Sequence, residues 1–164
     1  MKITLFAFFA PALLVQQVWS QPTVAPTNES TGSPRGTNVA SYNIQQSFEL
    51  GYRFETTDHA IVVSGDTRAG DAVAAACNGC DVLVHEVYSA EKFKTRPPEW
   101  QAYHARAHTS TIELAQIATR ARPKLLVMYH QLYWGTTDEG LLAEVRAAGY
   151  AGRLESAADL RTYR

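Results

Sequence analysis

Short apolar runs alternate with longer segments of helical periodicity from Phe48 to the end of the chain. Runs rich in β-branched residues between turn residues are typical of strands, and apolar residues three or four positions apart are typical of helices that cover a core. This alternation predicts an α/β fold in which a mixed sheet is joined by crossover helices. Strands are expected at residues 52–56, 60–63, 81–84, 124–129, 152–155 and 160–163, and helices at residues 71–77, 100–106, 110–122 and 136–148.

Acidic residues and histidines follow three of the expected strands directly. Asp66 follows the second strand, His85 and Glu86 follow the third, and His130 follows the fourth. Because ligands bind beyond the carboxyl ends of the strands in such a sheet, these side chains are expected to share one pocket. His108 is expected to join them from the start of a helix that a Ser110–Glu113 capping box begins.

Carboxylates and imidazoles are ligands that a catalytic divalent metal uses, so a metal-activated hydroxide is the expected nucleophile. Glu86 could orient a neighbouring imidazole or take part in proton transfer. Each residue alone also has an ordinary explanation, since Asp66 could cap a turn and His85 could be a hydrogen-bonded core histidine. His104 lies four residues before His108, but the helix break expected there favours a role for His104 as a helix-surface or packing residue rather than as a metal ligand.

The N-terminal region differs in composition from the rest of the chain. Lys2 precedes an apolar run that ends in small residues before Gln21, which predicts a signal peptide over residues 1–20 and a secreted protein without further membrane contact. Residues 21–47 are rich in Pro, Thr, Ser and Gly, which predicts a disordered linker. The folded domain is expected over residues 48–164.

Charge and cysteine content narrow the choice of partners. A net charge of -1 gives no basic footprint, so no nucleic-acid partner is expected. Cys77 and Cys80 could be a thiol redox pair, half of a zinc knuckle or a small disulfide. Their position at the end of an expected helix argues against the redox pair, and the lack of a second cysteine pair argues against the zinc knuckle.

Four short motifs occur in a fixed order, and together they carry a family resemblance. Residues 48–164 resemble the C-terminal half of metallo-β-lactamase-fold hydrolases, nearest to ribonuclease Z and the related arylsulfatase- or phosphodiesterase-like enzymes. The motifs are Ser64-Gly65-Asp66-Thr67, Val84-His85-Glu86, Ala107-His108-Thr109-Ser110 and Met128-Tyr129-His130.

This resemblance implies half of an αββα sandwich and a dinuclear zinc site. It implies that Asp66 bridges the two metals, that His130 binds one of them, and that His108 transfers protons or contacts the substrate phosphate. His85 and Glu86 match the loop beside that histidine, so both are expected to take part in catalysis. The family's His-x-His-x-Asp-His cluster has no counterpart, because no histidine precedes Phe48.

Two functions follow. The first is a metal-dependent hydrolase that acts on phosphoesters or related small esters through a zinc-bound hydroxide. Asp66 and His130 alone would be one ligand short of the three that a catalytic zinc site usually has. The alternative is a non-catalytic secreted remnant, because half a sandwich leaves an apolar sheet face for a homodimer or for a missing N-terminal half.

Overall fold

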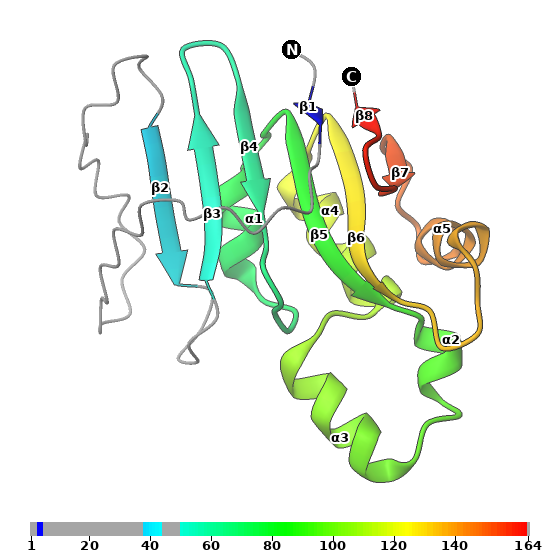
Figure 1. The fold of residues 1–164 in the computed structure, drawn as a ribbon. Helices are drawn as coiled ribbons and strands as arrows, with labels where there is room; N and C mark the ends of the chain where they lie inside the picture. The colour runs from blue at the N-terminus through cyan, green and yellow to red at the C-terminus, as the bar shows by residue number, and fades with distance from the viewer. Residues whose placement is uncertain (1–2, 5–37, 44–49, 164) are drawn as a thin grey trace.

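The computed structural model describes residues 3–4, 38–43 and 50–163 of the chain. Six of the strands in this part form one sheet in the order β2-β3-β4-β5-β6-β7 (Figure 1). Pairing is antiparallel from β2 to β4 and parallel from β4 to β7, which confirms the predicted mixed sheet. The strands are β2 (Asn38–Asn43), β3 (Leu50–Glu55), β4 (Ala60–Val63), β5 (Val82–Tyr88), β6 (Leu125–Leu132) and β7 (Leu154–Ser156).

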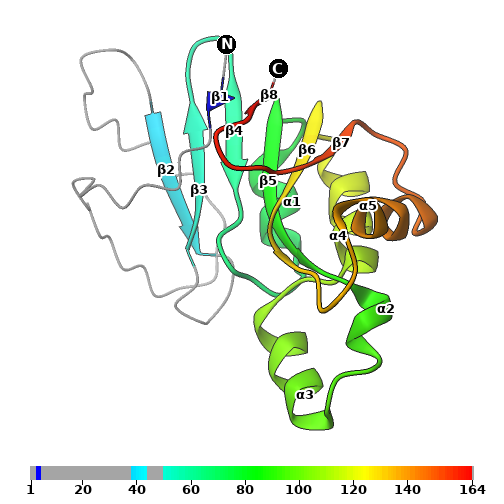
Figure 2. The same cartoon turned by 45° about the vertical axis from the view of Figure 1, so that its right-hand side comes forward.

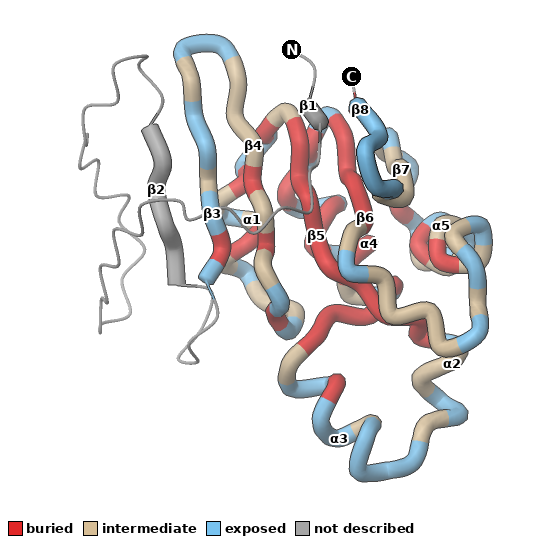
Figure 3. Tube along the Cα trace, in the orientation of Figure 1, coloured by how far each residue is buried: buried red, intermediate tan, exposed pale blue. Residues whose placement is uncertain are grey.

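Three crossover helices cover one face of this sheet (Figures 1 and 2). They are α1 (Asp71–Cys77), α4 (Thr111–Ala121) and α5 (Asp138–Ala147), which connect successive parallel strands. Apolar side chains such as Leu83, Leu114 and Leu126 are fully buried between the helices and the sheet. All seven residues of β5 are buried, because β4 and β6 cover its edges while the apolar clusters around Leu83 and around Val84 cover its two faces (Figure 3).

Two further helices, α2 (Ala90–Phe93) and α3 (Pro98–Ala107), project beyond the carboxyl end of β5 (Figure 1). The chain then returns to the sheet, where the backbone N–H of Tyr88 donates to the carbonyl of Thr109 at 2.9 Å. The predicted capping box begins α4, since the Ser110 hydroxyl accepts from the Glu113 N–H and the Glu113 carboxylate accepts from the Ser110 N–H. This return places His108 at the edge where the parallel strands end.

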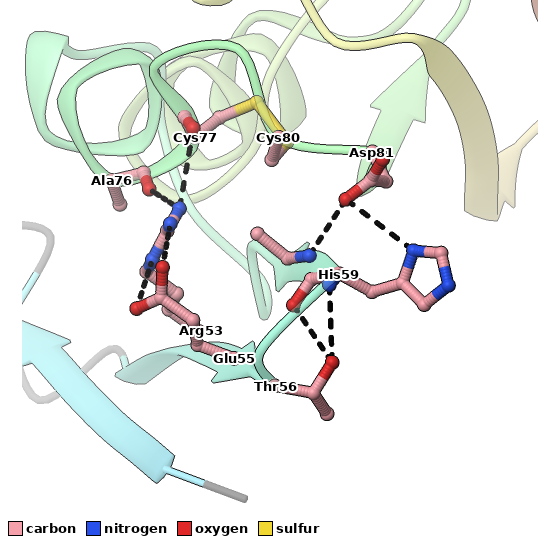
Figure 4. A network of polar contacts seen from close by, with 9 residues as sticks. Arg53, Glu55, Thr56, His59, Ala76, Cys77, Cys80 and Asp81 are labelled. Carbon is pink, nitrogen blue, oxygen red and sulfur yellow. Dashed lines mark hydrogen bonds and ion pairs between the residues drawn. A yellow bond between two sulfur atoms is a disulfide. The ribbon is translucent and has the colours of Figure 1, made fainter.

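A disulfide joins Cys77 and Cys80 at the end of α1 (Figure 4). Of the three possibilities considered for this cysteine pair, the structure therefore has the small disulfide. The Arg53 guanidinium donates to the carbonyls of Ala76 and Cys77, at 2.6 and 3.2 Å, and so satisfies helix-end acceptors that lack partners within the helix. Asp81 accepts from the backbone N–H of Ala60 at 2.7 Å. These contacts of Arg53 and Asp81 hold the end of α1 and the start of β5 against the β3–β4 hairpin.

The sheet face opposite the helices is apolar and only partly covered. Val84 and Val127 are buried there, and Tyr163 of β8 (Thr162–Tyr163) packs against them. Further along the same face, Tyr52 and Phe54 of β3 are each 37% exposed and Leu50 is 42% exposed. On this face, the apolar side chains of β3 are therefore exposed to solvent, whereas those of the central strands β5 and β6 are buried.

The N-terminal predictions fall mostly outside the described residues. Of the expected signal peptide, only β1 (Ile3–Thr4) is described, and it pairs antiparallel with β8. Of the expected linker over residues 21–47, the stretch Asn38–Asn43 forms β2 rather than disordered chain, because its backbone groups pair with the open edge of β3. In the described part of the chain, every helix is too short or too polar to cross a lipid bilayer.

Candidate metal centre

Asp66 lies in the turn that follows β4. Gly65 makes this turn possible, since its φ of +66° is unfavourable for other residues and a Cβ atom there would collide with the backbone oxygen of Leu50. The Asp66 side chain is 58% exposed, and its Oδ1 lies 3.3 Å from Nδ1 of His130. The turn therefore presents a carboxylate at the carboxyl edge of the sheet.

A β-bulge near the end of β6 positions His130. The register with β5 shifts at this point, so that Glu86 pairs with Tyr129 but Val87 pairs with Gln131. His130 is the extra residue, with a φ of +45°, which is uncommon for a residue with a side chain. Bulges of this kind redirect a side chain, and here the imidazole meets Asp66 instead of continuing the strand's alternation.

His108 completes a cluster of three possible metal ligands. It is the C-cap of α3, it is buried, and its ring centroid lies 5.6 Å from that of His130. One ligand atom from each of Asp66, His108 and His130 can be chosen so that all three lie within 4.8 Å of one another. The sequence grouped these residues at one edge, but it did not show that His108 would lie close enough to share a metal.

Glu86 lies behind this cluster and holds it together. Its Oε1 accepts from the backbone N–H groups of Thr67, at 3.2 Å, and Thr109, at 2.9 Å. Its Oε2 lies 3.4 Å from Nδ1 of His108, a distance in the ion-pair range but longer than a typical hydrogen bond. The Thr109 hydroxyl also donates to the Thr67 carbonyl at 2.7 Å, so the two loops that carry Asp66 and His108 are joined directly.

Burial changes the acidity of Glu86. The side chain is fully buried, and desolvation raises its pKa to about 7, although His108 and the two backbone donors oppose this rise. A carboxyl group with a pKa near neutrality can both release and accept a proton at physiological pH. The position of Glu86 beside His108 therefore suits proton transfer as well as the orientation of an imidazole.

His85 lies apart from the cluster. Adjacent residues of a strand point to opposite faces, so His85 shares the helix-covered face with Leu83 while Glu86 faces the cluster. Its Nδ1 contacts the Glu86 carbonyl at 2.7 Å, and its buried Nε2 has no hydrogen-bond partner among the described residues. Burial lowers its pKa to about 4, so the imidazole is neutral near pH 7.

Sequence reasoning missed some residues that surround the cluster. Tyr129 precedes His130 in the sheet, and burial, together with the charge of Asp66, raises its pKa to about 12. His104 is buried, as the packing interpretation expected, and its Nδ1 contacts the Trp100 carbonyl at 2.8 Å. Thr67 and Thr109 belong to the quoted motifs, but their backbone donors to Glu86 depend on tertiary contact that a single sequence does not display.

Comparisons with known proteins agree with this geometry. No protein-family model matches the sequence. The ribonuclease Z of Mycobacterium tuberculosis (strain H37Ra) is 30% identical over 112 residues, which is 68% of this chain and 41% of that protein. The ribonuclease Z of Anoxybacillus flavithermus is 35% identical over 91 residues, which is 52% of this chain and 26% of that protein. This chain thus spans half or less of the length of the relatives that it matches.

Solved structures extend the comparison to the fold. The metallo-β-lactamase fold protein YhfI from Bacillus subtilis superimposes with a TM-score of 0.65 at 16% identity, over 80% of this chain and 51% of that one. The short form of human tRNase Z superimposes with a TM-score of 0.55 at 18% identity, over 82% of this chain and 44% of that one. The chain is therefore a metallo-β-lactamase-fold protein. Within that fold, the curated relatives it matches are ribonucleases Z, which is consistent with the ribonuclease Z branch and with a partial, C-terminal segment.

Proposed function

We propose that this chain is a metal-dependent hydrolase of phosphoesters or related esters, with Asp66, His108 and His130 as ligands of a zinc ion. The observation that carries the proposal is the convergence of one carboxylate and two imidazoles within 4.8 Å. This ligand set suits zinc, and three protein ligands leave a position for water or substrate. His108 supplies the ligand that was missing from the pair of Asp66 and His130.

The surrounding residues support hydrolysis at this position. A bound zinc ion would supply a Lewis acid that lowers the pKa of water into the neutral range. Glu86 Oε2 contacts Nδ1 of His108, which leaves Nε2 as the ring nitrogen that would bind the metal. Glu86 is fully buried with Oε1 accepting from two backbone N–H groups and Oε2 beside His108, so a bound zinc would favour its carboxylate form, which orients the imidazole.

The proposal is tested by hydrolysis assays on the full chain after chelator treatment and after reloading with zinc. Bis(4-nitrophenyl) phosphate and 4-nitrophenyl sulfate represent the two ester classes. We expect zinc-dependent hydrolysis of at least one substrate, lost in Asp66→Ala and kept in His59→Ala, which removes a histidine that pairs with Asp58 in the β3–β4 turn, at the opposite end of β4 from Asp66. Hydrolysis that survives both the chelator and Asp66→Ala would contradict the proposal.

The same assay needs an RNA substrate. The expectation that no nucleic acid is involved has no support from the comparisons, because the relatives are named ribonuclease Z. The net charge of -1 still offers no broad attraction to the phosphate backbone. We therefore propose small esters as the main substrates, and cleavage of a structured RNA faster than of bis(4-nitrophenyl) phosphate would reverse that order.

Self-association is a second candidate function, favoured by the exposed stripe of Leu50, Tyr52 and Phe54 on β3. Contiguous exposed apolar side chains often mark protein interfaces. If the stripe forms a homodimer contact, Tyr52→Ser combined with Phe54→Ser should shift the mass measured by light scattering from dimer to monomer. Ile112→Ser, a matched control that is 46% exposed on α4, should leave the mass unchanged. A wild-type monomer would exclude this function.

We also propose secretion, which the disulfide between Cys77 and Cys80 supports, because disulfides persist mainly in oxidising compartments. The proposal predicts that protein recovered from the medium of expressing cells begins at Gln21 and contains no free thiol. Retention in the cells with an intact N-terminus would contradict it.

A further inference from the structure

A row of contacting rings leads from the surface of α3 to the metal cluster. The Trp100 ring stacks on His104 with a centroid distance of 5.4 Å and an interplanar angle of 15°. His104 in turn stacks on His108 at 5.4 Å. Tyr103 meets the same two histidines edge-on, at 5.0 Å from His104 and 6.2 Å from His108. Tyr103 is therefore one ring contact away from a ligand of the proposed metal, and Trp100 is two.

The inner and outer members of this row differ in exposure. His104 is 4% exposed and is held by Trp134, whose ring meets it edge-on at 4.7 Å. Trp100 and Tyr103 are 53% and 55% exposed and line a hollow together with Glu99. Exposed aromatic side chains that lie together can mark a binding surface, and Tyr103 is in ring contact with the cluster residue His108.

We propose that Trp100 and Tyr103 form a stacking surface for the aromatic group of the ester substrate. The inference rests on the proposed hydrolase function, and it names the class of substrate that the site takes. The Tyr103 ring contacts the His108 ring directly, at 6.2 Å between centroids, so a substrate ring that lies against Tyr103 would hold its attached phosphate on the side of the cluster. The substrate would then be an aryl or nucleoside phosphate, in which a flat ring is joined to a charged ester.

The charges around the hollow favour this orientation. Glu99 borders the hollow, so a negatively charged ester would be repelled there, whereas a neutral ring would not. The two imidazoles and the proposed metal provide the favourable place for the anionic end. The rigid support of Trp100 by His104 also means that little conformational freedom is lost when a ligand ring stacks on it.

Binding measurements on the full chain can separate this proposal from the metal proposal. The probes are AMP and phenyl phosphate, which carry a ring, and ribose 5-phosphate, which carries none. Affinity is measured by calorimetry with and without added zinc, and the zinc stoichiometry is measured separately. The variants are Trp100→Leu, Tyr103→Leu and Tyr103→Phe, with Tyr52→Leu as a control that removes an exposed ring from β3.

We expect AMP or phenyl phosphate to bind more tightly than ribose 5-phosphate. Trp100→Leu and Tyr103→Leu should each weaken binding of the ring-bearing probe by about fivefold or more, because this is the lower end of what one stacking contact contributes. Binding of ribose 5-phosphate, the zinc stoichiometry and the Tyr52→Leu control should not change, and Tyr103→Phe should restore binding. A preference for AMP over phenyl phosphate would identify the ring as a nucleobase, and the reverse would identify an aryl ester.

The two proposals fail in different ways. If zinc binds but the ring adds no affinity, or if the variants weaken all probes equally, the stacking surface is wrong and the metal site stands. If no zinc binds but the ring-bearing probe still depends on Trp100 and Tyr103, the metal site is wrong and the stacking surface stands. If the wild-type chain binds none of the probes, the stacking surface is wrong whatever the zinc content.

Discussion

His85 and Glu86 are neighbours on the same buried strand, yet the two faces of the sheet give them opposite properties. On the helix-covered face, His85 contacts one backbone carbonyl, and burial lowers its pKa to about 4. On the cluster face, Glu86 accepts two backbone hydrogen bonds and lies beside His108, and burial raises its pKa to about 7. Desolvation favours the neutral form of both groups, but only Glu86 lies beside a residue of the proposed metal site.

The largest expected effect is a loss of reaction rate, and we expect it for a substitution of Glu86 but not of His85. Glu86→Gln keeps an oxygen for the Thr67 and Thr109 donors but removes the negative charge that orients His108. If the chain hydrolyses esters as proposed, the rate should fall by about 10- to 100-fold, the range for removing the partner that orients a metal-binding histidine. Steady-state kinetics should show the loss in kcat. A rate within threefold of wild type, on the order of experimental scatter, would remove Glu86 from the mechanism.

The two faces should also respond to pH in opposite directions. The pKa of Glu86 is about 7 in the folded chain against 4.5 as its reference, so its stabilising contribution is complete below pH 4.5 and is lost as the pH rises to 7. The pKa of His85 is about 4 against 6.5, so its contribution is complete above pH 6.5 and is lost as the pH falls to 4. Each shift corresponds to about 3 kcal/mol of unfolding free energy.

Single substitutions should separate these opposing contributions. In urea unfolding of chelator-treated protein, Glu86→Gln should make stability rise more steeply with pH between 4.5 and 6.5 than in wild type. His85→Gln should make it fall more steeply over the same range. If the stability of wild type and both variants changes with pH in the same way, then neither the raised pKa of Glu86 nor the lowered pKa of His85 is correct.

A smaller effect is expected from the turn that carries Asp66. Gly65→Ala introduces a Cβ that collides with the Leu50 carbonyl at a positive φ, which should cost about 1–2 kcal/mol or more of unfolding free energy. Gly149→Ala is the matched control, because its φ is also positive but a Cβ there meets no atom within 4 Å. Equal losses in denaturant unfolding would mean that the collision at Gly65 contributes nothing.

The smallest effect on the rate is expected on the helix face. His85→Leu replaces an imidazole whose Nε2 lacks a hydrogen-bond partner among the described residues, so the rate should stay within the same order of magnitude as wild type. A loss as large as that of Glu86→Gln in the same assay would show that His85 does act in the reaction, as the motif resemblance implies.

The sequence predicted most of the sheet and the grouping of the candidate ligands. Strand periodicity, the capping box at Ser110 and the rule that sites lie at the carboxyl ends of strands are local or topological signals, and the structure confirms the mixed α/β sheet. The expected helix over residues 136–148 begins later in the structure, as α5 at Asp138, because the Thr137 side chain rather than that of Thr136 caps it by accepting from the Gly140 N–H. Both threonines fit the cap preference, so only the tertiary fold selects between them.

Other features could not be predicted from one sequence. The bulge at His130 depends on how β5 and β6 pair, and the approach of His108 depends on the path of α3 beyond the sheet. His85 was grouped with Glu86 because both follow the same apolar run, but the run continues as strand through Tyr88. Side chains alternate between the two faces along this longer strand, so His85 and Glu86 point to opposite faces. The sequence-based prediction ended the strand at Val84 and therefore missed this difference.

The most direct test of the central claim is zinc titration of the full, chelator-treated chain by calorimetry, with Asp66→Ala, His108→Ala, His130→Ala and the control His59→Ala. The account predicts about one tightly bound zinc per wild-type chain, as expected for three protein ligands, and a loss of at least about tenfold in affinity for each cluster variant but not for His59→Ala. Zinc binding that is absent from the wild-type chain, or that is unchanged by all three cluster substitutions, would contradict the proposed metal centre.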